Sequence, residues 1–375
     1  MQTTGDLSLY FHIPFCLKKC PYCHFYSKRF NQTLKNKFLI SLEKEIFLKR
    51  SLFVNRNIVS IYLGGGTPSL LNKKDLERIF IALDIDINNI EITIEANPID
   101  ISIDKLKELK QTYFNRISIG CVSFDDVLLK VLNRSHNSLQ AKEAVFLANR
   151  FFENISLDLL YDIPHQDKNS FLKDLQTIKD LPITHLSLYN LTFEENTPFF
   201  KKKETFKQSL PSEKVSLSLL NLAIEELNKM KLNRYEISAF SKAGYESIHN
   251  TGYWKGREFL GFGPSAFSYF NKKRFRNVCN VETYYQNLSK NKEIIDYEEM
   301  LPYPDNIKEL LAVNLRLVKG VNLKEFVNRY EEIDKSTKEA LKQLKEDELI
   351  ECDIDSIRLT EKGLLFYDTV AERII

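Results

Sequence analysis

The sequence lacks the features by which a membrane protein or a secreted protein is usually recognised. No apolar run approaches the roughly 18 residues needed to span a bilayer. The first fifteen residues have neither a basic start nor the small-residue cleavage site of a signal peptide. The formal net charge of +2 is too small to indicate a nucleic acid or an anionic membrane as partner. We therefore expect a globular cytoplasmic protein with no transmembrane segment and no nucleic-acid partner.

Cysteine is scarce, but three of the six cysteines are close together in the sequence. Cys16, Cys20 and Cys23 lie within one segment of eight residues that follows an expected strand. One thiol of an odd set must stay free, and the spacings are too short for easy bridging, so disulfides do not account for all three. Thiolates at this density suit an iron–sulfur cluster or zinc, and they fit a reducing compartment.

A second pair of cysteines, which most zinc sites require, is missing. Cys121, Cys279 and Cys352 each stand alone, and we expect them to behave as small apolar side chains. A zinc site that borrows His24 or His12 is the alternative. The spacing favours a [4Fe-4S] cluster held by three cysteines, with one iron left open to a further ligand.

The first two-thirds of the chain alternates short β-branched runs with amphipathic helical segments. Six such units predict a parallel sheet with helices outside, either an open doubly wound sheet or a barrel, with the chemistry at the carboxyl ends of the strands. The expected strands are Leu7–Ile13, Val59–Leu63, Ile90–Glu95, Arg116–Gly120, Ile155–Leu160 and His185–Leu191. The expected helices are Asn36–Arg50, Lys73–Leu83, Ile103–Thr112, Leu139–Asn149 and Lys168–Asp180.

The pattern changes after Thr192. A polar connection, a helix over Glu213–Lys231 and a short strand over Tyr235–Phe240 precede an aromatic, glycine-rich stretch that ends near Phe270. From about Pro304, helices followed by strand, turn, strand and helix predict a small α+β winged-helix-like domain. We expect two domains, residues 1–275 and 276–375, and the near-neutral charge favours packing over DNA reading as the role of the second.

A glycine run follows the second expected strand. Gly64, Gly65, Gly66 and Thr67 allow the backbone to approach a ligand closely and to present its N–H groups. The lysine of the nucleotide-triphosphate motif is missing, so a phosphate loop of that kind is not indicated. A tight turn between strand and helix is the alternative.

Three charged residues are weaker candidates. Glu95 closes the third strand, where a carboxylate can accept hydrogen bonds from ribose hydroxyls or pair with an ammonium group; the alternative is a surface glutamate beside a helix N-cap at Asn97. Arg134 could pair with a carboxylate through two hydrogen bonds, and Asp158 must find a partner if its apolar strand is buried.

The spacing Cys-x3-Cys-x2-Cys resembles the signature of the radical S-adenosylmethionine (SAM) superfamily. In that family a partial (β/α)6 barrel carries a [4Fe-4S] cluster, whose fourth iron is chelated by the amino and carboxylate groups of SAM. The resemblance implies that Cys16, Cys20 and Cys23 ligate the cluster. It implies a SAM site built from Tyr10, Tyr22, Gly64, Gly65, Gly66, Thr67, Glu95, Arg134 and Asp158.

The order of YFHIPFC, GGGTPS, EANP, RISIGCVSF and LDLLYDIP resembles the oxygen-independent coproporphyrinogen III oxidase-like branch. The segment HNTGYW, which starts at His249, is similar to the HNxxYW motif that marks the haem chaperones of this branch. The oxidases carry a fourth cysteine where this chain has Phe25, and a long extension ahead of the first strand. Both differences favour a chaperone, and the resemblance runs from Leu7 to about Phe270, with the C-terminal module matching in outline.

The resemblance implies haem binding through His249, with Tyr253 and Trp254 stacked on the porphyrin. A hydrogen-bonded structural histidine is the alternative. The implied function is to pass haem to an acceptor protein, with an electron donor as a further partner; SAM cleavage is left open and no catalytic residue is assigned. The alternatives are a coproporphyrinogen III oxidase, which makes a 5′-deoxyadenosyl radical from SAM for oxidative decarboxylation in porphyrin synthesis, and a radical SAM enzyme with another substrate.

Two positions depart from the family pattern. Val122 stands where the family usually has glutamine, and Asp162 stands where a glycine is usual. An amide that could hydrogen-bond SAM is thus replaced by an apolar group. These changes put a second SAM molecule in doubt but leave the first site intact.

Overall fold

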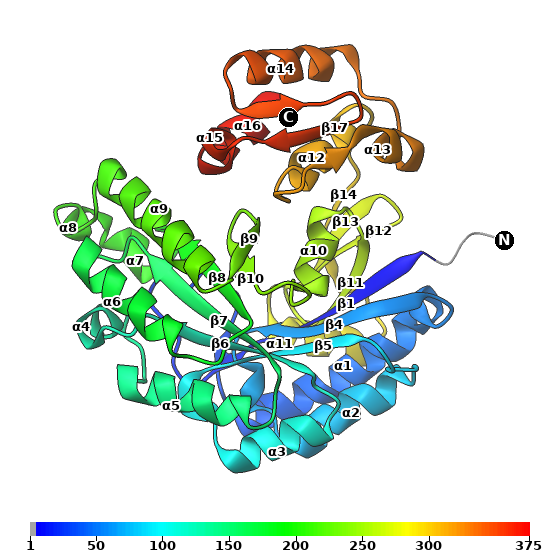
Figure 1. Cartoon of the computed structure of the whole chain (residues 1–375). Coiled ribbons are helices and arrows are strands. Elements are labelled where there is room, and N and C mark those ends of the chain that lie inside the picture. Colours follow the sequence, from blue (N-terminus) through cyan, green and yellow to red (C-terminus); the bar gives the residue numbers. More distant parts are fainter. Residues whose placement is uncertain (1–4) are drawn as a thin grey trace.

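A curved sheet of twelve strands dominates the structure, a computed structural model that describes residues 5–375. Seven neighbouring strands are parallel, in the order β11-β1-β4-β5-β6-β7-β8. Their bounds are β1 (Asp6–Ile13), β4 (Asn57–Gly65), β5 (Glu91–Ala96), β6 (Arg116–Val122), β7 (Asn154–Tyr161), β8 (His185–Asn190) and β11 (Glu258–Phe262). Figure 1 shows that the parallel strands form an open, partial barrel.

The six predicted strands are confirmed as β1 and β4 to β8, because their apolar runs are buried from both sides. The seventh parallel strand, β11, was not predicted. It pairs with β1, placing Leu7 beside Glu258 and Phe11 beside Phe262. The strand expected over Tyr235–Phe240 is a hairpin of β9 (Asn233–Glu236) and β10 (Ala239–Ser241).

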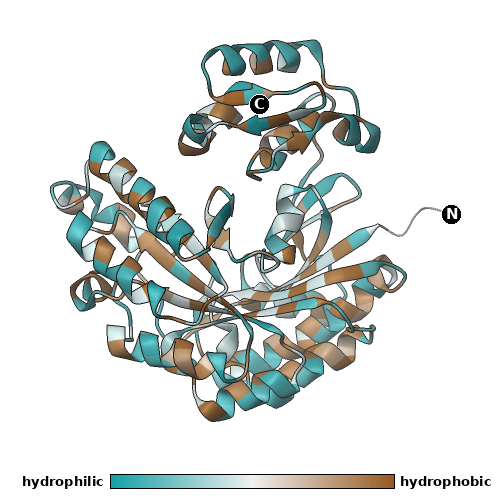
Figure 2. Ribbon diagram, viewed as in Figure 1, coloured by the Kyte–Doolittle hydropathy of each residue, from teal (hydrophilic) through white to brown (hydrophobic). Residues whose placement is uncertain are grey.

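Helices cover the convex face of the sheet (Figure 1). Their apolar sides face the strands, and Figure 2 shows hydrophilic residues on the outer sides of the helices. Several begin with a side-chain cap, as at Asn72 and Ser102, which fixes the turn that leaves each strand. The bounds are α1 (Gln32–Phe53), α2 (Lys73–Leu83), α3 (Ile103–Gln111), α4 (Asp126–Val131), α5 (Ser138–Asn149), α6 (Lys168–Lys179) and α9 (Glu213–Lys229).

Antiparallel strands complete the edge of the sheet beyond β11. They are β12 (Phe267–Phe270), β13 (Lys273–Asn277) and β14 (Ile295–Glu299); α11 (Val281–Ser289) connects β13 to β14 and packs on α1. Short elements flank the site loops: β2 (Phe15–Cys16), β3 (Lys28–Arg29), the 3-10 turns Pro68–Leu70 and Pro98–Asp100, α7 (Pro198–Lys201), α8 (Lys203–Phe206) and α10 (Ile248–Trp254).

The C-terminal part has its own hydrophobic cluster, which begins at Ile307, whereas Ile294 still packs into the core of the barrel. We therefore propose a domain boundary near residue 300 in place of the expected 275/276. The helices and the antiparallel sheet β15-β17-β16 match the expected winged-helix-like pattern. The elements are α12 (Asp305–Asn314), β15 (Val321–Asn322), α13 (Leu323–Arg329), α14 (Lys335–Glu346), β16 (Ile350–Cys352), β17 (Ser356–Leu359), α15 (Glu361–Leu365) and α16 (Tyr367–Ile374).

The C-terminal domain lies across the open side of the barrel (Figure 1). Two contacts join it to the segment around α10: the Tyr330 hydroxyl donates to the Lys255 carbonyl at 2.9 Å, and the Arg316 guanidinium lies 4.2 Å from the centre of the Trp254 ring. No helix within residues 5–375 is both long enough and apolar enough to traverse a bilayer.

Candidate functional site

The cysteine loop leaves β1 and is closed at its base by the short parallel pair β2–β3. Phe15 pairs with Lys28 and Cys16 with Arg29, and the Phe30 N–H donates to the Cys16 carbonyl at 2.9 Å. Within the loop, the Cys23 N–H donates to the Cys20 carbonyl at 3.2 Å. These bonds fold eight residues of loop into one turn, so that all three thiols border the same cavity.

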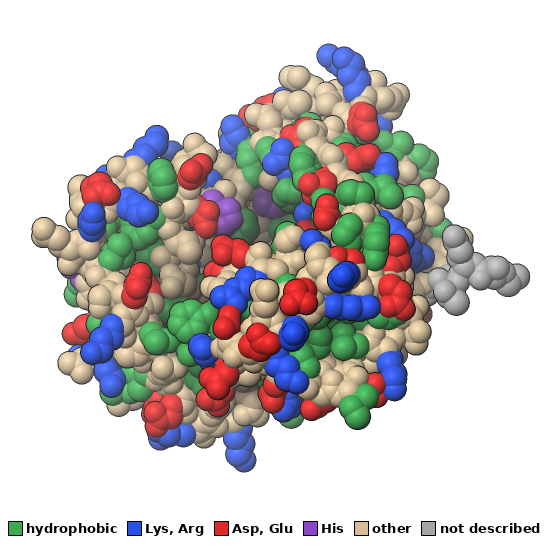
Figure 3. All heavy atoms as spheres, turned by 90° about the horizontal axis from the view of Figure 1, so that it is seen from above, with side chains coloured by type: hydrophobic (Ala, Val, Ile, Leu, Met, Phe, Trp, Pro, Cys, Tyr) green, Lys and Arg blue, Asp and Glu red, His purple; other side chains and the backbone are tan. Residues whose placement is uncertain are grey.

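This cavity, here called the cluster cavity, has a volume of about 540 Å³ and lies at the carboxyl ends of the strands. The face seen from above in Figure 3 is hollowed near its centre, with histidine and hydrophobic side chains at the hollow. The residues expected to bind the cluster and SAM that line the cavity are Tyr10, Cys16, Cys20, Tyr22, Cys23, Gly65, Gly66, Thr67, Glu95, Arg134 and Asp158. Gly64 lies behind the wall.

A single metal ion does not fit this arrangement. Among residues 5–375, no three His, Cys, Asp or Glu side chains are placed to hold one ion. His12, which the zinc alternative would borrow, is buried, and its ring nitrogens are 3.2 Å from the Tyr10 hydroxyl and 2.8 Å from the Tyr26 carbonyl. A cubane offers a separate iron to each thiolate, so it needs sulfurs that stand further apart.

A chain of hydrogen bonds links two of the thiols. Arg134 donates to the Cys20 sulfur at 3.1 Å and to Asn97 at 2.8 Å. Asn97 donates to Thr67 at 3.1 Å, and the Thr67 hydroxyl donates to the Cys16 sulfur at 3.6 Å. The side chain of Asn97 thus holds the site together and makes no helix-capping bond, contrary to the alternative reading of this residue.

Arg134 carries a positive charge into the cavity. Besides its bonds to Cys20 and Asn97, it donates to the Gly120 carbonyl at 2.6 Å, while its buried Nε has no partner. Nearby thiolates are stabilised by such a cation. Burial raises the pKa of Cys23, so this thiol keeps its proton until a metal displaces it.

The glycine turn approaches the cysteine loop closely. The Gly66 N–H donates to the Ile13 carbonyl at 2.9 Å, and a Cβ at Gly66 would lie 2.6 Å from the Phe15 carbonyl oxygen. A side chain at Gly65, whose φ is +103°, would lie 2.5 Å from the His12 ring. Only glycine therefore lets the backbone form this wall.

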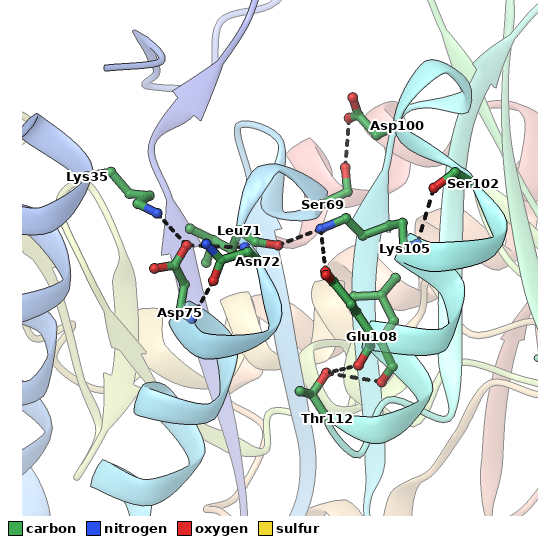
Figure 4. A network of polar contacts seen from close by, with 11 residues as sticks. Lys35, Ser69, Leu71, Asn72, Asp75, Asp100, Ser102, Lys105, Glu108 and Thr112 are labelled. Atoms are coloured by element: carbon green, nitrogen blue, oxygen red, sulfur yellow. Dashed lines mark hydrogen bonds and ion pairs between the residues drawn. The ribbon is translucent and has the colours of Figure 1, made fainter. Parts of the chain in front are cut away.

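A polar network on the outer side of the barrel holds the glycine turn that follows β4 in place (Figure 4). Ser69 donates to Asp100 at 2.8 Å, which ties the glycine turn to the loop after β5. Asn72 and Asp75 form a capping box at the start of α2, and Lys35 pairs with Asp75 at 2.5 Å. The loops that end β4 and β5 are thereby held in one position.

Glu95 belongs to the cavity wall and not to the outer surface, which was the alternative. It accepts hydrogen bonds from the Tyr62 hydroxyl at 2.9 Å and from the Gly65 N–H at 3.2 Å. Burial, and then the charge of Asp158, raise the pKa of Glu95 to about 7. Asp158 accepts from Ser118 at 3.2 Å, and burial raises its pKa as well.

Arg116 supplies the positive charge that faces these two acids. Its side chain is 1% exposed, its Nε has no partner, and its charge lowers the pKa of both Glu95 and Asp158. Arg116 begins the expected strand Arg116–Gly120, and its sequence context alone indicates no role for it. An arginine in an otherwise apolar, buried strand was the signal that could have found it.

The aromatic residues take different places. Tyr10 stacks on Tyr62 with ring centres 6.2 Å apart, and Tyr22 packs edge-on against Phe199 at 6.0 Å. Tyr253 and Trp254 do not line the cluster cavity; they line a neighbouring cavity of about 490 Å³, into which Tyr10 also projects. Apart from Tyr10, which borders both cavities, the structure separates the residues expected to bind SAM from Tyr253 and Trp254, which are expected to bind haem.

His249 is held inside the protein. It is 1% exposed, and its ring nitrogens lie 2.9 Å from the Ser60 hydroxyl and 2.8 Å from the Tyr253 hydroxyl. Burial lowers the pKa of His249 to about 3, so the ring is neutral. In this conformation neither nitrogen is free for iron, as the structural alternative for this residue anticipates.

The two departures from the family pattern share an unusual backbone. Val122 lines the cluster cavity at a φ of 63°, and Asp162 has a φ of 62°. Glycine is favoured in this left-handed region and aspartate is tolerated, but a β-branched residue is strained. Asp162 lies outside the cavity and accepts from Asn190 at 2.8 Å.

The comparisons with known proteins agree with this geometry. The radical SAM superfamily matches residues 10–178, and the HemN C-terminal domain matches residues 301–366. The chain is 33% identical to the protein named heme chaperone HemW of Lactococcus lactis, over 98% of this chain and 97% of the relative. The chain belongs to the HemW family of radical SAM proteins.

Other relatives give the same family. The heme chaperone HemW of Bacillus subtilis is 32% identical over 97% of both chains, and that of Escherichia coli is 29% identical over 99% of both. The solved structure of the coproporphyrinogen III oxidase HemN from Escherichia coli covers 98% of this chain and 90% of its own, with a TM-score of 0.86 and 24% identity. That likeness shows the fold.

Membership of the radical SAM family implies a [4Fe-4S] cluster and SAM. The residues present fit both groups. Three thiols and the glycine backbone border one cavity, and the buried Nε of Arg134 lacks a partner there. This donor set is that of a cluster with three cysteine ligands.

Proposed function

We propose that this protein is a haem chaperone that binds haem and passes it to an acceptor protein. Relatives that match nearly the whole chain carry the name heme chaperone HemW. The single observation that carries the proposal is the pair of adjoining cavities. One has the thiols for a cluster, and the other has the aromatic rings of Tyr253 and Trp254 for a flat ligand.

We propose that Cys16, Cys20 and Cys23 hold the [4Fe-4S] cluster, which when bound supplies single electrons and an open iron for SAM. The glycine turn presents its backbone to the bound SAM, and Glu95 accepts a hydrogen bond from its hydroxyl or ammonium groups. Arg134 keeps the loop closed through Cys20 and Asn97. Tyr10, Tyr22 and Asp158 complete the walls, with Gly64 supporting Glu95 from behind.

Phe25 argues against the oxidase. The oxidases that this chain resembles carry a fourth cysteine at this position, and here an exposed phenyl ring lies between the two cavities. A haem acceptor protein and an electron donor are the partners we propose. All six cysteines are unbridged, which suits a reducing compartment, and we therefore propose a cytoplasmic location.

The first test is the cluster. The full chain, reconstituted anaerobically with iron and sulfide, should hold one [4Fe-4S] cluster, and Cys23→Ser should lose it. Cys279→Ser is the matched control, because Cys279 does not line the cluster cavity and its thiol instead donates to the Ser265 hydroxyl at 3.5 Å. A wild-type sample that takes up only zinc would contradict the radical SAM assignment of the cysteines.

The second test separates chaperone from oxidase. Haem added to the reconstituted protein should give a new Soret band, and the haem should move to apomyoglobin offered as acceptor. Incubation with reductant, SAM and coproporphyrinogen III should leave the propionate side chains intact. Decarboxylated product at enzymatic rates would make the protein an oxidase.

A further inference from the structure

The cavity beside the cluster cavity, here called the aromatic cavity, is walled mainly by flat rings. It lies between the antiparallel edge of the barrel and α12 of the C-terminal domain and has a volume of about 490 Å³. Its rings belong to Tyr253, Trp254, Phe259, Phe267 and Tyr269, and β1 and the cysteine loop add those of Tyr10, His12, His24, Phe25 and Tyr26. Walls of this kind suit a large planar ligand that stacks on aromatic faces.

A third cavity of about 600 Å³, here called the cationic cavity, adjoins the aromatic cavity. Both are lined by Arg257, Tyr269 and Arg274, and also by Glu309, whose carboxylate is held by Arg274 at 2.5 Å. A ligand in the aromatic cavity can therefore extend polar arms into the cationic one.

Three cations of the cationic cavity have no acidic partner within residues 5–375: Lys255, Arg257 and Arg329. Arg257 donates only to the Ser8 hydroxyl at 3.2 Å and the Ile248 carbonyl at 3.1 Å. Arg329 lies 5.2 Å from the Tyr330 ring. The other cations of the wall pair with carboxylates, as Arg56 does with Glu258 at 2.7 Å.

The unpaired cations act on one another. Burial, and then the charges of Lys319, Arg257 and Arg329, lower the pKa of Lys255. Asp6, which also lines the cationic cavity, opposes the lowering of the Arg257 pKa and offsets part of this positive charge, and an anion would stabilise the rest. Two carboxylates at one end of a flat apolar ligand would match this charge.

His24 lies where the aromatic and cluster cavities meet, because it borders both. It is exposed and makes no hydrogen bond with the described part of the chain, and its ring packs on Phe25 with centres 4.5 Å apart. The other histidine of the aromatic cavity, His12, has both nitrogens engaged. His24 therefore offers the one free imidazole in its wall, and imidazole is a ligand of haem iron.

We propose, on the basis of the proposed haem-carrying function, that haem lies in the aromatic cavity with His24 on its iron. Its propionates reach Lys255, Arg257 and Arg329 in the cationic cavity. His249 then has a positioning role: it holds the Tyr253 hydroxyl and orients that ring toward the haem.

The proposed contact between the haem propionates and the cations is tested by changing the ligand and keeping the wild-type protein. The result therefore does not depend on whether a variant folds. Haem and haem dimethyl ester, whose propionates are neutral, are titrated into the reconstituted full chain. Wild type should bind the ester about ten- to a hundredfold more weakly, as expected for the loss of charge-assisted hydrogen bonds. Equal affinity for both would overturn the assignment of the cations.

Variants then locate the contacts. Arg329→Gln, on the exposed end of α13, should reduce affinity for haem several-fold and leave affinity for the ester unchanged; Lys255→Gln should do the same. Lys342→Gln, an exposed lysine on the remote helix α14, is the control and should bind both ligands as wild type does. Losses of equal size for haem and ester would contradict a propionate contact.

The iron ligand is tested by spectrum. His24→Asn should shift the Soret band and change the ligand-field signals of ferric haem, while metal-free protoporphyrin IX should bind as it does to wild type. His165→Asn, on an exposed loop at a φ of 70° that asparagine tolerates, is the matched control. If His249→Ala removes the imidazole signature and His24→Asn leaves it, the assignment of His24 is wrong.

The two proposals fail in different ways. A wild-type protein that binds no haem contradicts the proposed function together with the site. A wild-type protein that binds haem, with every variant and the ester equal to it, contradicts the site alone.

Discussion

Replacing Glu95 by glutamine should remove part of the pH dependence of folding stability. Burial and the charge of Asp158 raise the pKa of Glu95 from 4.5 to about 7 in the folded protein. Between these values the folded chain binds a proton that the unfolded chain has released. Stability is therefore highest below the unfolded pKa and is lost as the pH rises through the folded pKa.

The size of the effect follows from the shift. One pKa unit corresponds to about 1.4 kcal/mol, so between pH 5 and pH 8 wild type should lose about 2 to 3 kcal/mol relative to Glu95→Gln. Asp174, whose burial also raises its pKa to about 7, contributes equally to both proteins and cancels in the difference. Asp158→Asn should reduce the same slope, because it removes the charge next to Glu95.

The assay is urea unfolding of the metal-free, reduced chain at four pH values, followed by the fluorescence of Trp254, the single tryptophan. As the pH rises, the free energy of unfolding of Glu95→Gln should increase relative to that of wild type. Parallel curves across this range would refute the reasoning that burial holds a proton on Glu95.

Two predictions concern the backbone of the cavity wall. Val122→Gly and Val122→Ala should be about equally stable, because glycine avoids the cost of a φ of 63°, about 1 to 2 kcal/mol, and this gain offsets the greater chain entropy and the lost packing of glycine. Val145, which is buried in α5, is the control site, and there the glycine variant should be about 1 kcal/mol less stable than the alanine variant. Thermal melts that show the same difference between glycine and alanine at both sites would contradict this prediction. Gly65→Ala should cost more stability than Gly244→Ala, since both have a positive φ but only the former Cβ meets a neighbour, at 2.5 Å; equal losses would show that the His12 ring gives way freely.

Much of the barrel could be predicted because its strands are short apolar runs between amphipathic helices. β11 was missed because Glu258–Phe262 lies in an aromatic, glycine-rich stretch without a clear period, and its pairing with β1 is a long-range choice. The antiparallel edge strand β13, KRFRN, is mostly charged and carries no strand pattern. Such strands are set by their neighbours more than by their own residues.

The cysteines, the glycine turn and Glu95 could be placed together from sequence because parallel strands end at one rim. The state of His249 could not, since a motif does not reveal that Ser60 and Tyr253 occupy both ring nitrogens. Arg116 was likewise hidden, because its role depends on two acids from other strands. The local sequence pattern predicts the position of a residue on a strand or helix, but the contacts of its side chain depend on tertiary packing.

The pairing of β11 with β1 has a consequence for synthesis. The two strands lie about 250 residues apart, and until β11 leaves the ribosome one edge of β1 has no partner. The strand that leads into the metal-binding loop is thus finished late, so a nascent chain cannot present a complete docking place for iron until about two-thirds of it has been translated. Delivery of iron and sulfide is accordingly expected only after β11 has emerged, either late in elongation or after release.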